Sequence, residues 1–437
     1  MTICEPKSCL ACSACANVCP HDAIKLMENQ YGELCAVIDE GLCHKCGLCF
    51  MTCPVNARYQ YRRPDYCYAA WTSDKSRRAK CASGGIATAF AEHVIVSKRG
   101  TVAGTAYDNH LIPHVVIAET TAQAEQFKGS KYVQSIVSRT ILREIKKHLD
   151  SGRFVLYIGT PCQTAGLLSF LHGTRNNLIT VDLLCHGTPP TRYFKEEVET
   201  LCRKHGLKDI SNVRFRGNDD DNSRRTLLDR FFGVSYSNNF RFSMWKRSVC
   251  GDEILVYRGE PDTNYYMAGF LMGITLREAC YNCKFARPER ISDITLGDFI
   301  NLGRKQSFPH EKTNVSVVLV NTNKGARFFR DFLETDKSIV AIERDYSERL
   351  DYPYSIVRPF PRHFLNHRFR RLYLKNGYSK AIEKTFRGWL FMKRIFGKLH
   401  HFANLPVYAV DKIKKRMIRV GAQIKSSSRN LKTKEPR

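Results

Sequence analysis

The chain has 437 residues, of which 43% are hydrophobic, and it carries a formal net charge of +27 at pH 7. This length and composition indicate a globular protein with two or three domains and a sizeable core. No uncharged apolar stretch of 18 residues occurs, so no membrane span is expected. The first residues, MTICE, lack the basic and apolar segments of a signal peptide, so the 18 cysteines favour a reducing cytoplasm over a disulfide framework.

Two copies of one cysteine pattern lie within the first 54 residues, 34 residues apart. Each copy is Cys-x2-Cys-x2-Cys-x3-Cys-Pro, and the cysteines are Cys9, Cys12, Cys15 and Cys19, then Cys43, Cys46, Cys49 and Cys53. Three closely spaced cysteines hold three corners of one [4Fe–4S] cube, and the cysteine before proline ligates the other cube. The spacing therefore assigns Cys9, Cys12, Cys15 and Cys53 to one cluster, and Cys43, Cys46, Cys49 and Cys19 to the second.

Zinc is the alternative for these cysteines, because it also binds Cys-x2-Cys pairs. Zinc gives no reason, however, for a triplet followed by Cys-Pro to occur twice. Residues 1–62 resemble a bacterial two-cluster ferredoxin domain, which passes single electrons.

After a short linker at 59–65, helix-like and strand-like patterns alternate. Helices are predicted at 83–96, 140–149, 163–171 and 326–333, and strands at 101–106, 114–118, 154–158, 178–184, 210–215, 292–299 and 315–320. The polar segment 219–222 is expected to be a solvated loop. The strand–helix–strand unit at 154–184 predicts parallel strands covered by a helix. We expect an α+β ferredoxin domain (1–62), an α/β body in two parts (65–150 and 151–350) and a basic helical tail (362–437).

Two cysteines follow strands of the predicted parallel unit. Cys162 lies in GTPCQ and Cys185 in CHGTP, and ligands of open parallel sheets bind beyond the carboxyl ends of strands. Cys162 also lies at a predicted helix N-terminus, which favours a thiolate. The pair Cys280-x2-Cys283 could complete a third cluster site with them. The alternative is that Cys162 and Cys185 are small core residues and that the pair binds zinc or nothing.

Six segments occur together and in order: SGGIAT from Ser83, GSKYVQ from Gly129, GTPCQ from Gly159, CHGTP from Cys185, the pair Cys280-x2-Cys283, and DITLGD from Asp293. Over residues 65–345 the chain thereby resembles the β-subunit family of coenzyme F420 (deazaflavin) hydrogenases and dehydrogenases. The resemblance implies an α/β flavoprotein that holds FAD, or FMN, beside a [4Fe–4S] cluster. It also implies that Cys162, Cys185, Cys280 and Cys283 ligate that cluster.

The resemblance further suggests which residues hold the flavin. The expected cofactor-binding residues are Ser83, Gly84, Gly85, Lys131, Gly159, Thr160 and Asp298. The two glycines would let backbone N–H groups approach a phosphate or the flavin edge. Asp298 either contacts the flavin or caps a turn.

Two residues are candidates for catalysis. Lys131 would neutralise flavin or substrate charge, and its alternative is a solvated surface lysine. His186 would help to move a proton, and its alternative is a structural role beside a cluster ligand. The remaining cysteines have no partner spacing and are interpreted as free thiols: Cys4, Cys35, Cys67, Cys81, Cys202 and Cys250.

The basic charge is concentrated in the tail. Residues 362–437 hold 21 Lys and Arg against three acidic residues, a net charge of +18, so the rest of the chain carries only +9. Apolar residues from Phe386 to Phe402 recur at spacings of three and four among lysines and arginines. This pattern fits an amphipathic helix at an anionic membrane surface, on the cytoplasmic side, or a helix packed on the enzyme or a partner. The tail lacks the aromatic pattern of nucleic-acid modules, so no nucleic acid is expected.

The chain departs from the hydrogenase subunit by carrying its own ferredoxin and a long tail, and it shows no nickel-site cysteine pairs near its two ends. Relatives include a reductase of a chlorophyll derivative, and some are encoded among cell-surface polysaccharide genes. The family name therefore does not by itself predict that this chain uses coenzyme F420. The leading hypothesis is a cytoplasmic iron–sulfur flavoenzyme that links an external one-electron partner protein to a small organic or deazaflavin-like substrate. The alternative is a non-catalytic electron-transfer subunit of a larger complex.

Overall fold

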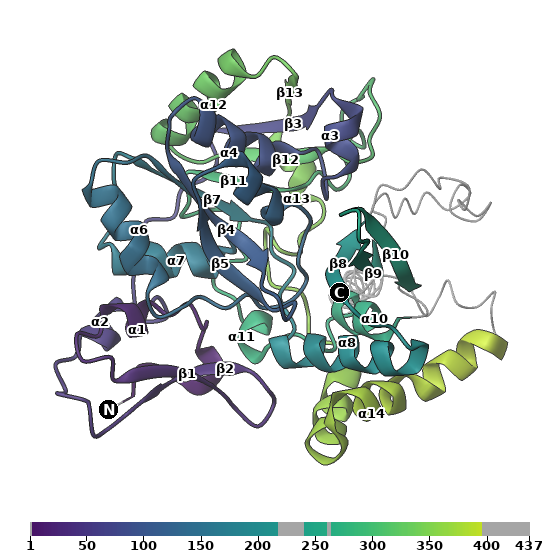
Figure 1. Cartoon of the computed structure of the whole chain (residues 1–437). Helices are drawn as coiled ribbons and strands as arrows, with labels where there is room; N and C mark the ends of the chain where they lie inside the picture. Colours follow the sequence, from purple (N-terminus) through teal and green to yellow (C-terminus); the bar gives the residue numbers. More distant parts are fainter. Residues whose placement is uncertain (1, 217–239, 260–263, 396–437) are drawn as a thin grey trace, which may run out of the picture. The chain divides into compact units, whose positions relative to one another are not determined.

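The computed structural model describes residues 2–216, 240–259 and 264–395. The chain divides into two units, residues 1–382 and residues 383–437. The first unit contains the ferredoxin segment and the whole α/β body (Figure 1). In the second unit, only the end of α14 (Leu365–Ile395) is described; α14 consists of two helices that meet at a kink at Gly377, whose φ is +71°. Apart from Phe386, which is buried, the expected apolar face of the tail falls outside the residues whose side chains are described, and so does the loop at 219–222.

The ferredoxin segment consists of five short elements, among them two helices and two strands. In chain order they are η1 (Pro6–Ser8), α1 (Ala14–Val18), β1 (Ile24–Glu28), β2 (Leu34–Ile38) and α2 (Leu48–Thr52). Strands β1 and β2 form an antiparallel hairpin, whose turn is held because the Asn29 side chain accepts hydrogen bonds from the backbone of Tyr31 and Glu33. Helices α1 and α2 each follow a residue in the left-handed conformation, Ser13 and Gly47.

The body is organised around one eight-stranded mixed sheet. In spatial order its strands are β13 (Ile339–Glu343), β3 (Tyr66–Thr72), β12 (Ser316–Val320), β11 (Ile294–Asp298), β7 (Leu178–Leu183), β6 (Val155–Gly159), β4 (Thr101–Tyr107) and β5 (Pro113–Ala118). Strands β4, β6, β7 and β11 are mutually parallel, and the other neighbours are antiparallel. The carboxyl ends of these four strands therefore share one edge, which we call the C-edge.

Alternating residues send side chains to opposite faces of this sheet. On one face Leu156 and Ile179 pack with α4 (Ile86–Val96) and α12 (Asn323–Thr335). On the other face Val155, Tyr157 and Leu178 pack with α6 (Ile141–Asp150), α7 (Pro161–Phe170) and part of the ferredoxin segment. The ferredoxin segment therefore shares a hydrophobic core with the body.

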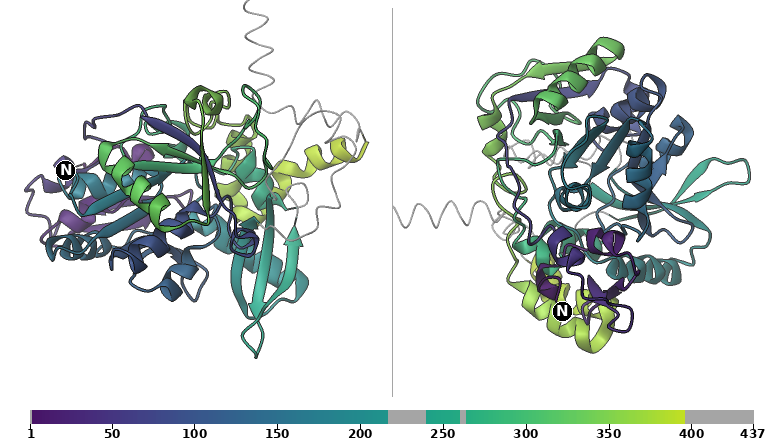
Figure 2. Two further views of the ribbon diagram at one scale, coloured as in Figure 1. Left: turned by 90° about the horizontal axis from the view of Figure 1, so that it is seen from above. Right: turned by 90° about the vertical axis from the view of Figure 1, so that its left-hand side faces the viewer.

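A second, three-stranded antiparallel sheet consists of β8 (Ile210–Arg216), β9 (Phe240–Arg247) and β10 (Glu253–Gly259), and it projects from the body in both views of Figure 2. The remaining helices are α3 (Lys75–Ala79), α5 (Thr121–Ala124), η2 (Glu125–Phe127), α8 (Thr191–His205), α10 (Tyr265–Leu271), α11 (Glu278–Tyr281), α13 (Tyr346–Leu350) and α14 (Leu365–Ile395). Among the described residues, no helix is both long and apolar enough to cross a membrane.

The prediction of an α/β body with a parallel strand–helix–strand unit is confirmed, because β6 and β7 pair in parallel on either side of α7. Both expected parts of the body contribute to one sheet, since β3 pairs with β12 and β4 with β6. The segment at 59–65 is not a free linker. The Tyr59 hydroxyl donates to the Ala165 carbonyl at 3.0 Å. The backbones of Arg62 and Arg290 exchange two hydrogen bonds, at 2.9 and 2.7 Å, as an isolated antiparallel β-bridge.

Candidate iron–sulfur and cofactor site

The ferredoxin cysteines line two separate cavities. The outer cavity, about 350 Å³ including its part open to solvent, is lined by Cys19, Cys43, Cys46 and Cys49. The inner cavity, about 310 Å³ by the same measure, contains Cys9, Cys12, Cys15 and Cys53 in its lining. These are the two sets that the spacing predicts, with Cys19 and Cys53 crossing over. Among the described residues, no three Cys, His, Asp or Glu side chains converge closely enough to hold a single metal ion.

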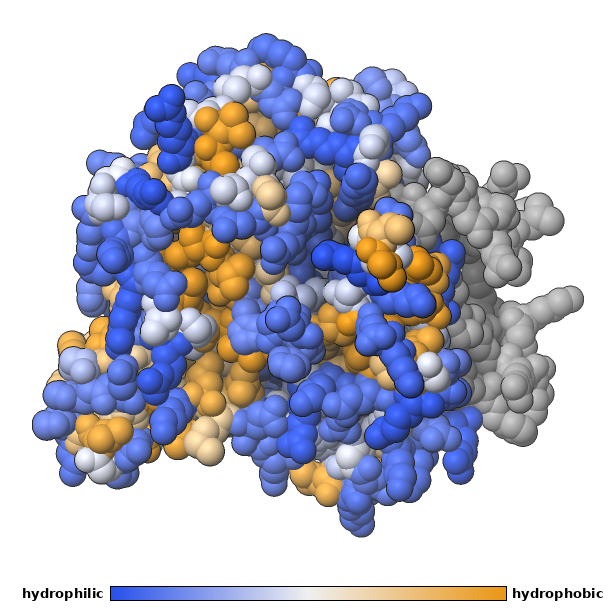
Figure 3. Space-filling view, in the orientation of Figure 1, coloured by the Kyte–Doolittle hydropathy of each residue, from blue (hydrophilic) through white to orange (hydrophobic). Residues whose placement is uncertain are grey.

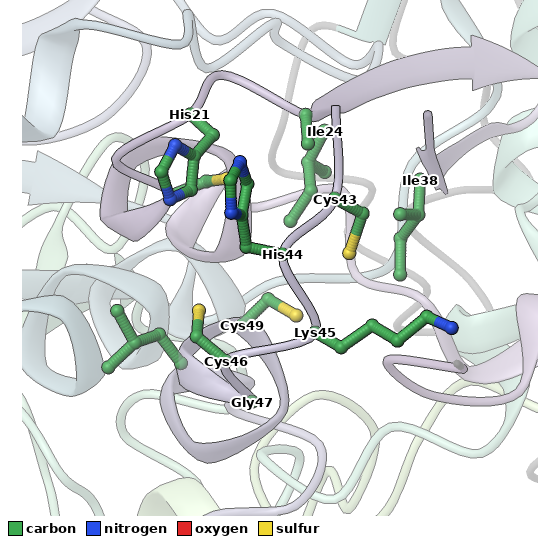
Figure 4. Close-up of a pocket in the computed structure, with 12 residues that line it drawn as sticks. His21, Ile24, Ile38, Cys43, His44, Lys45, Cys46, Gly47 and Cys49 are labelled. Carbon is green, nitrogen blue, oxygen red and sulfur yellow. The ribbon is translucent and has the colours of Figure 1, made fainter. Parts of the chain in front are cut away.

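The two cavities differ in exposure. Cys46 is exposed and Cys43 half-buried, whereas all four predicted ligands in the inner cavity are buried. In Figure 4 the side chains of Cys43, Cys46 and Cys49 surround the outer cavity, and the rings of His21 and His44 stack beside it with centroids 3.9 Å apart. The outer cavity therefore faces solvent.

The inner cavity is pressed against helix α7 of the body. A Cβ on Gly166 would lie 2.7 Å from Cys12 Cβ and 2.9 Å from Cys12 Sγ, so only glycine fits here. Gly166 lies one helical turn after Cys162, a rise of about 6 Å along the axis. The same helix thus contacts the inner cavity and carries a predicted ligand of the third cluster.

Two arginines fasten the ferredoxin segment to the body. Arg277 donates to the carbonyls of Cys9 at 2.9 Å and Leu10 at 3.2 Å. Arg143, on α6, donates to the carbonyls of Asn17 at 2.6 Å and Cys19 at 2.8 Å. The backbone around both cavities is therefore positioned by charged hydrogen bonds from the body.

Four cysteines of the body gather at the C-edge, and we call them the C-edge cysteines: Cys162, Cys185, Cys280 and Cys283. Burial raises the pKa of Cys162, Cys185 and Cys283, and the nearby thiols of the same group raise it further. The Cys185 loop packs on Cys280 through Gly187, whose φ is +112° and whose Cβ would lie 3.2 Å from Cys280 Cβ. These four cysteines are half-buried, and neighbouring thiols that are partly withdrawn from water resist ionisation unless a cation lies among them, so the donor set fits a cluster.

A buried ion pair holds the Cys280–Cys283 segment against the sheet. Arg290 donates to Asp182 of β7 at 2.9 Å, and both side chains are 1% exposed. Arg290 also donates to the carbonyl of Phe285 at 3.1 Å. Because Cys185 follows β7 and Cys283 precedes Phe285, this pair fixes the two cysteines relative to each other.

Tyr157 lies between the inner cavity and the C-edge cysteines. Its ring packs in the same core as Cys12, and its pKa is raised by burial and then by the neighbouring Cys162 and Cys12. Its hydroxyl is buried without a hydrogen-bond partner in the described structure. Gly159 makes room for the ring, since its Cβ would lie 2.9 Å from Tyr157 Cε1.

The predicted flavin residues Ser83, Gly84 and Gly85 lie at the C-edge as well. Gly84 N donates to Ser316 Oγ at 3.0 Å, and Ser316 is paired in register with Asp298 at the end of β11. Gly84 cannot carry a side chain, because a Cβ would lie 2.3 Å from the Ala70 carbonyl oxygen. That its backbone N–H also approaches a phosphate stays a prediction.

Some polar groups at this edge are still unsatisfied. The Ser83 hydroxyl is buried without a partner in the described structure, and so are both amide atoms of Gln134. Helix α4 starts after Gly85 without a side-chain cap, which leaves N–H groups for an anion. These features fit a polar ligand such as a flavin.

Thr160 contacts the first turn of its own helix, α7. It caps α7 in a capping box with Gln163, and its hydroxyl lies 3.1 Å from Cys162 Sγ. It therefore orients a predicted cluster ligand, and direct flavin binding stays a prediction.

Lys131 points into its own loop. Its ammonium group donates to four backbone carbonyls, of Gln126, Phe127, Lys128 and Gly129, at 3.2–3.4 Å. It also lies 5.3 Å from the centroid of the Tyr107 ring, at the C-edge end of β4. Lys131 is thus not a solvated surface lysine, and this geometry gives it a role in holding the loop.

His186 is enclosed by aromatic rings. Its Nε2 donates to the Phe270 carbonyl at 3.1 Å, and its ring centroid lies 3.9 Å from that of Phe360. Burial lowers the pKa of His186 to about 4, so the ring is neutral near pH 7. This environment favours the structural alternative over proton transfer.

Asp298 forms a two-point ion pair with Arg216, at 3.0 and 2.9 Å. The Arg216 side chain is 6% exposed, and nearby Asp298 raises its pKa against the effect of burial. Arg216 comes from the second sheet, so the pair ties that sheet to the C-edge. The sequence near β8 does not mark Arg216 as the partner of Asp298. Gln134 was not named as a site residue, although it lies within the segment GSKYVQ.

Fold and cysteine geometry together define a class: an iron–sulfur protein with a two-cavity ferredoxin segment docked on an α/β body. Family models agree with this description. Residues 8–57 match the "4Fe-4S dicluster domain", and residues 67–141 and 152–343 match the N-terminal and C-terminal models of the "Coenzyme F420 hydrogenase/dehydrogenase, beta subunit". The chain belongs to the coenzyme F420 hydrogenase/dehydrogenase beta-subunit family and carries a 4Fe-4S dicluster domain in front of it.

Two relatives add detail. A coenzyme F420-dependent sulfite reductase from Methanocaldococcus jannaschii is 27% identical over 322 residues, which cover 72% of this chain and 44% of the relative. The chain thus spans less than half of that relative's length. A chain of the xenon-derivatised F420-reducing [NiFe] hydrogenase complex from Methanosarcina barkeri is 15% identical, with a TM-score of 0.40, and the match covers 75% of this chain and 93% of that one. That TM-score does not establish a shared fold.

Proposed function

We propose that this protein is an iron–sulfur flavoenzyme that connects two-electron hydride chemistry at the C-edge to one-electron transfer at the ferredoxin surface. The observation that carries the proposal is the arrangement of three cysteine groups from solvent to the C-edge. The outer cavity has one exposed cysteine, Cys46, the four predicted ligands of the inner cavity are buried and Cys12 lies against α7, and the C-edge cysteines begin one turn away on the same helix.

Different groups of residues would hold the clusters and the flavin. The ferredoxin cysteines and the C-edge cysteines would hold three [4Fe–4S] clusters. Ser83, Gln134 and the N-terminus of α4 would hold a flavin, FAD or FMN, at the C-edge. A bound flavin supplies exchange of two electrons as hydride with an organic substrate and of single electrons with a cluster.

A deazaflavin is the substrate class that the family name favours. The relative from Methanocaldococcus jannaschii is named as F420-dependent. The residues that match the two F420 family models, 67–141 and 152–343, include the segments that form the C-edge here. Its sulfite reductase activity is not carried over, because the chain covers only 44% of its length. A role in polysaccharide synthesis, a cytoplasmic location and a membrane-bound tail stay predictions.

A second candidate is an electron-transfer subunit without its own organic substrate. Exposed apolar side chains near the outer cavity in sequence support docking to a larger redox protein: Leu42 is 48%, Phe50 48% and Met51 65% exposed. Figure 3 shows hydrophobic surface over the ferredoxin part of the molecule. Such a patch is typical of an interaction site.

The deciding experiment is anaerobic purification, identification of the bound flavin, and stopped-flow mixing with reduced F420, NADH and NADPH as hydride donors. We expect one donor to bleach first the flavin and then the cluster absorbance. In Cys162→Ala, flavin reduction should persist while cluster bleaching slows. Absence of flavin, or no reaction with any donor alongside electron exchange with a protein partner, favours the subunit function.

A further inference from the structure

The inner cavity has more cysteines than a [4Fe–4S] cluster uses. Its lining includes Cys4 in addition to Cys9, Cys12, Cys15 and Cys53. The outer cavity is lined by four cysteines only. From sequence alone Cys4 is interpreted as a free thiol, because five residues before Cys9 is not a ligand spacing.

Cys4 is held in place although it lies near the chain start. The preceding residue, Ile3, is 5% exposed and belongs to the ferredoxin core. The Ile3 carbonyl accepts a hydrogen bond from Asn56 Nδ2 at 2.9 Å, and Asn56 N donates to the Cys53 carbonyl at 2.9 Å. One asparagine therefore fixes the backbone of Cys4 beside that of Cys53.

The Cys4 side chain shares a cavity with the predicted ligands. It lines the inner cavity together with Cys9 and Cys53, and it packs against the hydrophobic cluster that contains Cys53. Cys4 is half-buried, whereas Cys53 and Cys9 are buried. The Cys4 side chain therefore lines the same cavity as Cys53, and Asn56 holds the backbones of the two residues near each other.

We propose that Cys4 is a reserve ligand of the inner cluster and replaces Cys53 at its fourth corner. In the exchange the iron–sulfur bond to Cys53 breaks, a bond to Cys4 forms, and the Cys4 proton passes to Cys53, so no electron is gained or lost. The triplet Cys9, Cys12 and Cys15 stays bound throughout. The proposal rests on the two-cluster assignment and not on the flavin.

The internal repeat provides a matched control. With the 34-residue offset, Cys4 corresponds to Ile38, which lines the outer cavity. A second control is Cys35, which does not line the inner cavity and donates to the Pro6 carbonyl at 3.4 Å, although the backbone of the next residue, Ala36, donates to Cys9 Sγ at 3.5 Å.

The test is iron and sulfide content with electron paramagnetic resonance, on full-length protein purified anaerobically. Cys53→Ala should retain the iron of the parent chain, whereas Cys19→Ala should lose between one iron and one whole cluster. Adding Cys4→Ala to Cys53→Ala should cause the same loss, and adding Cys35→Ala should not. Adding Ile38→Cys to Cys19→Ala should restore the iron of the outer cluster.

Equal iron loss in Cys53→Ala with and without Cys4 would overturn the proposal. If Cys53→Ala does not accumulate as soluble protein, Cys53→Ser replaces it, because a serine oxygen is a weaker ligand that preserves size. Iron release to a chelator should then be faster after Cys4→Ala, and equal rates would overturn the proposal.

Discussion

Gly166 is a point of close approach between the ferredoxin segment and the body, so Gly166→Ala probes the docking directly. The new Cβ would lie 2.7 Å from Cys12 Cβ, whereas ordinary carbon contacts are about 3.5–4.0 Å. The inner cavity and α7 must therefore separate by about 1 Å. Overpacking of this kind costs about 1–3 kcal/mol, against a gain of about 1 kcal/mol for Ala over Gly in a helix. The expected result is a net loss of up to about 2 kcal/mol.

The assay for Gly166→Ala is thermal unfolding under anaerobic conditions, together with the magnetic coupling between clusters in electron paramagnetic resonance. We expect a lower Tm and weaker coupling. The control is Gly41→Ala, whose Cβ meets only Asp39 Oδ1 at 3.4 Å. A higher Tm for Gly166→Ala, as for an unhindered helical glycine, would refute the close docking.

Two further predictions concern buried charges. Asp182→Asn leaves the Arg290 charge buried and unpaired, so we expect a loss of about 3–5 kcal/mol by thermal or chemical unfolding, and an unchanged Tm would contradict the structural role of the pair. Glu197 is buried, which raises its pKa from 4.5 to about 7, and Asn264 donates to it at 2.9 Å. Because the folded state then binds the proton more tightly, this residue contributes stability that is present below about pH 4.5 and lost as the pH rises to about 7, an effect on the order of 3 kcal/mol. Glu197→Gln should therefore gain Tm relative to the parent chain at pH 8 but not at pH 4.5, and a pH-independent difference would exclude this titration.

Local patterns were sufficient to predict the parallel centre of the sheet. Strands β6 and β7 are short apolar runs rich in strand-forming residues, with the helical segment α7 between them, and this order gave the correct element types and the parallel pairing. Strands β3 and β13 were missed, because they pair with each other from opposite ends of the body's sequence, and nothing local marks that partnership.

The cysteine groups could be predicted because cluster ligation imposes spacing on the chain. The supporting residues could not, since their roles depend on approach in space. In the sequence, Gly166 is an ordinary helical residue and Cys4 is an isolated cysteine. Only the fold shows that Gly166 lies against Cys12 and that Asn56 holds the backbones near Cys4 and Cys53 together. The roles of Lys131 and His186 were likewise set by surroundings that spacing does not encode.

The most direct test of the central claim is the iron and sulfide content of anaerobically reconstituted full-length protein. Three clusters, two in the ferredoxin cavities and one among the C-edge cysteines, predict about 12 iron and 12 sulfide per chain. Cys162→Ala should reduce both by up to about four. Iron and sulfide contents that saturate near eight per parent chain, with no further loss in Cys162→Ala, would show that the C-edge cysteines hold no cluster. The proposed electron path to the C-edge would then be wrong.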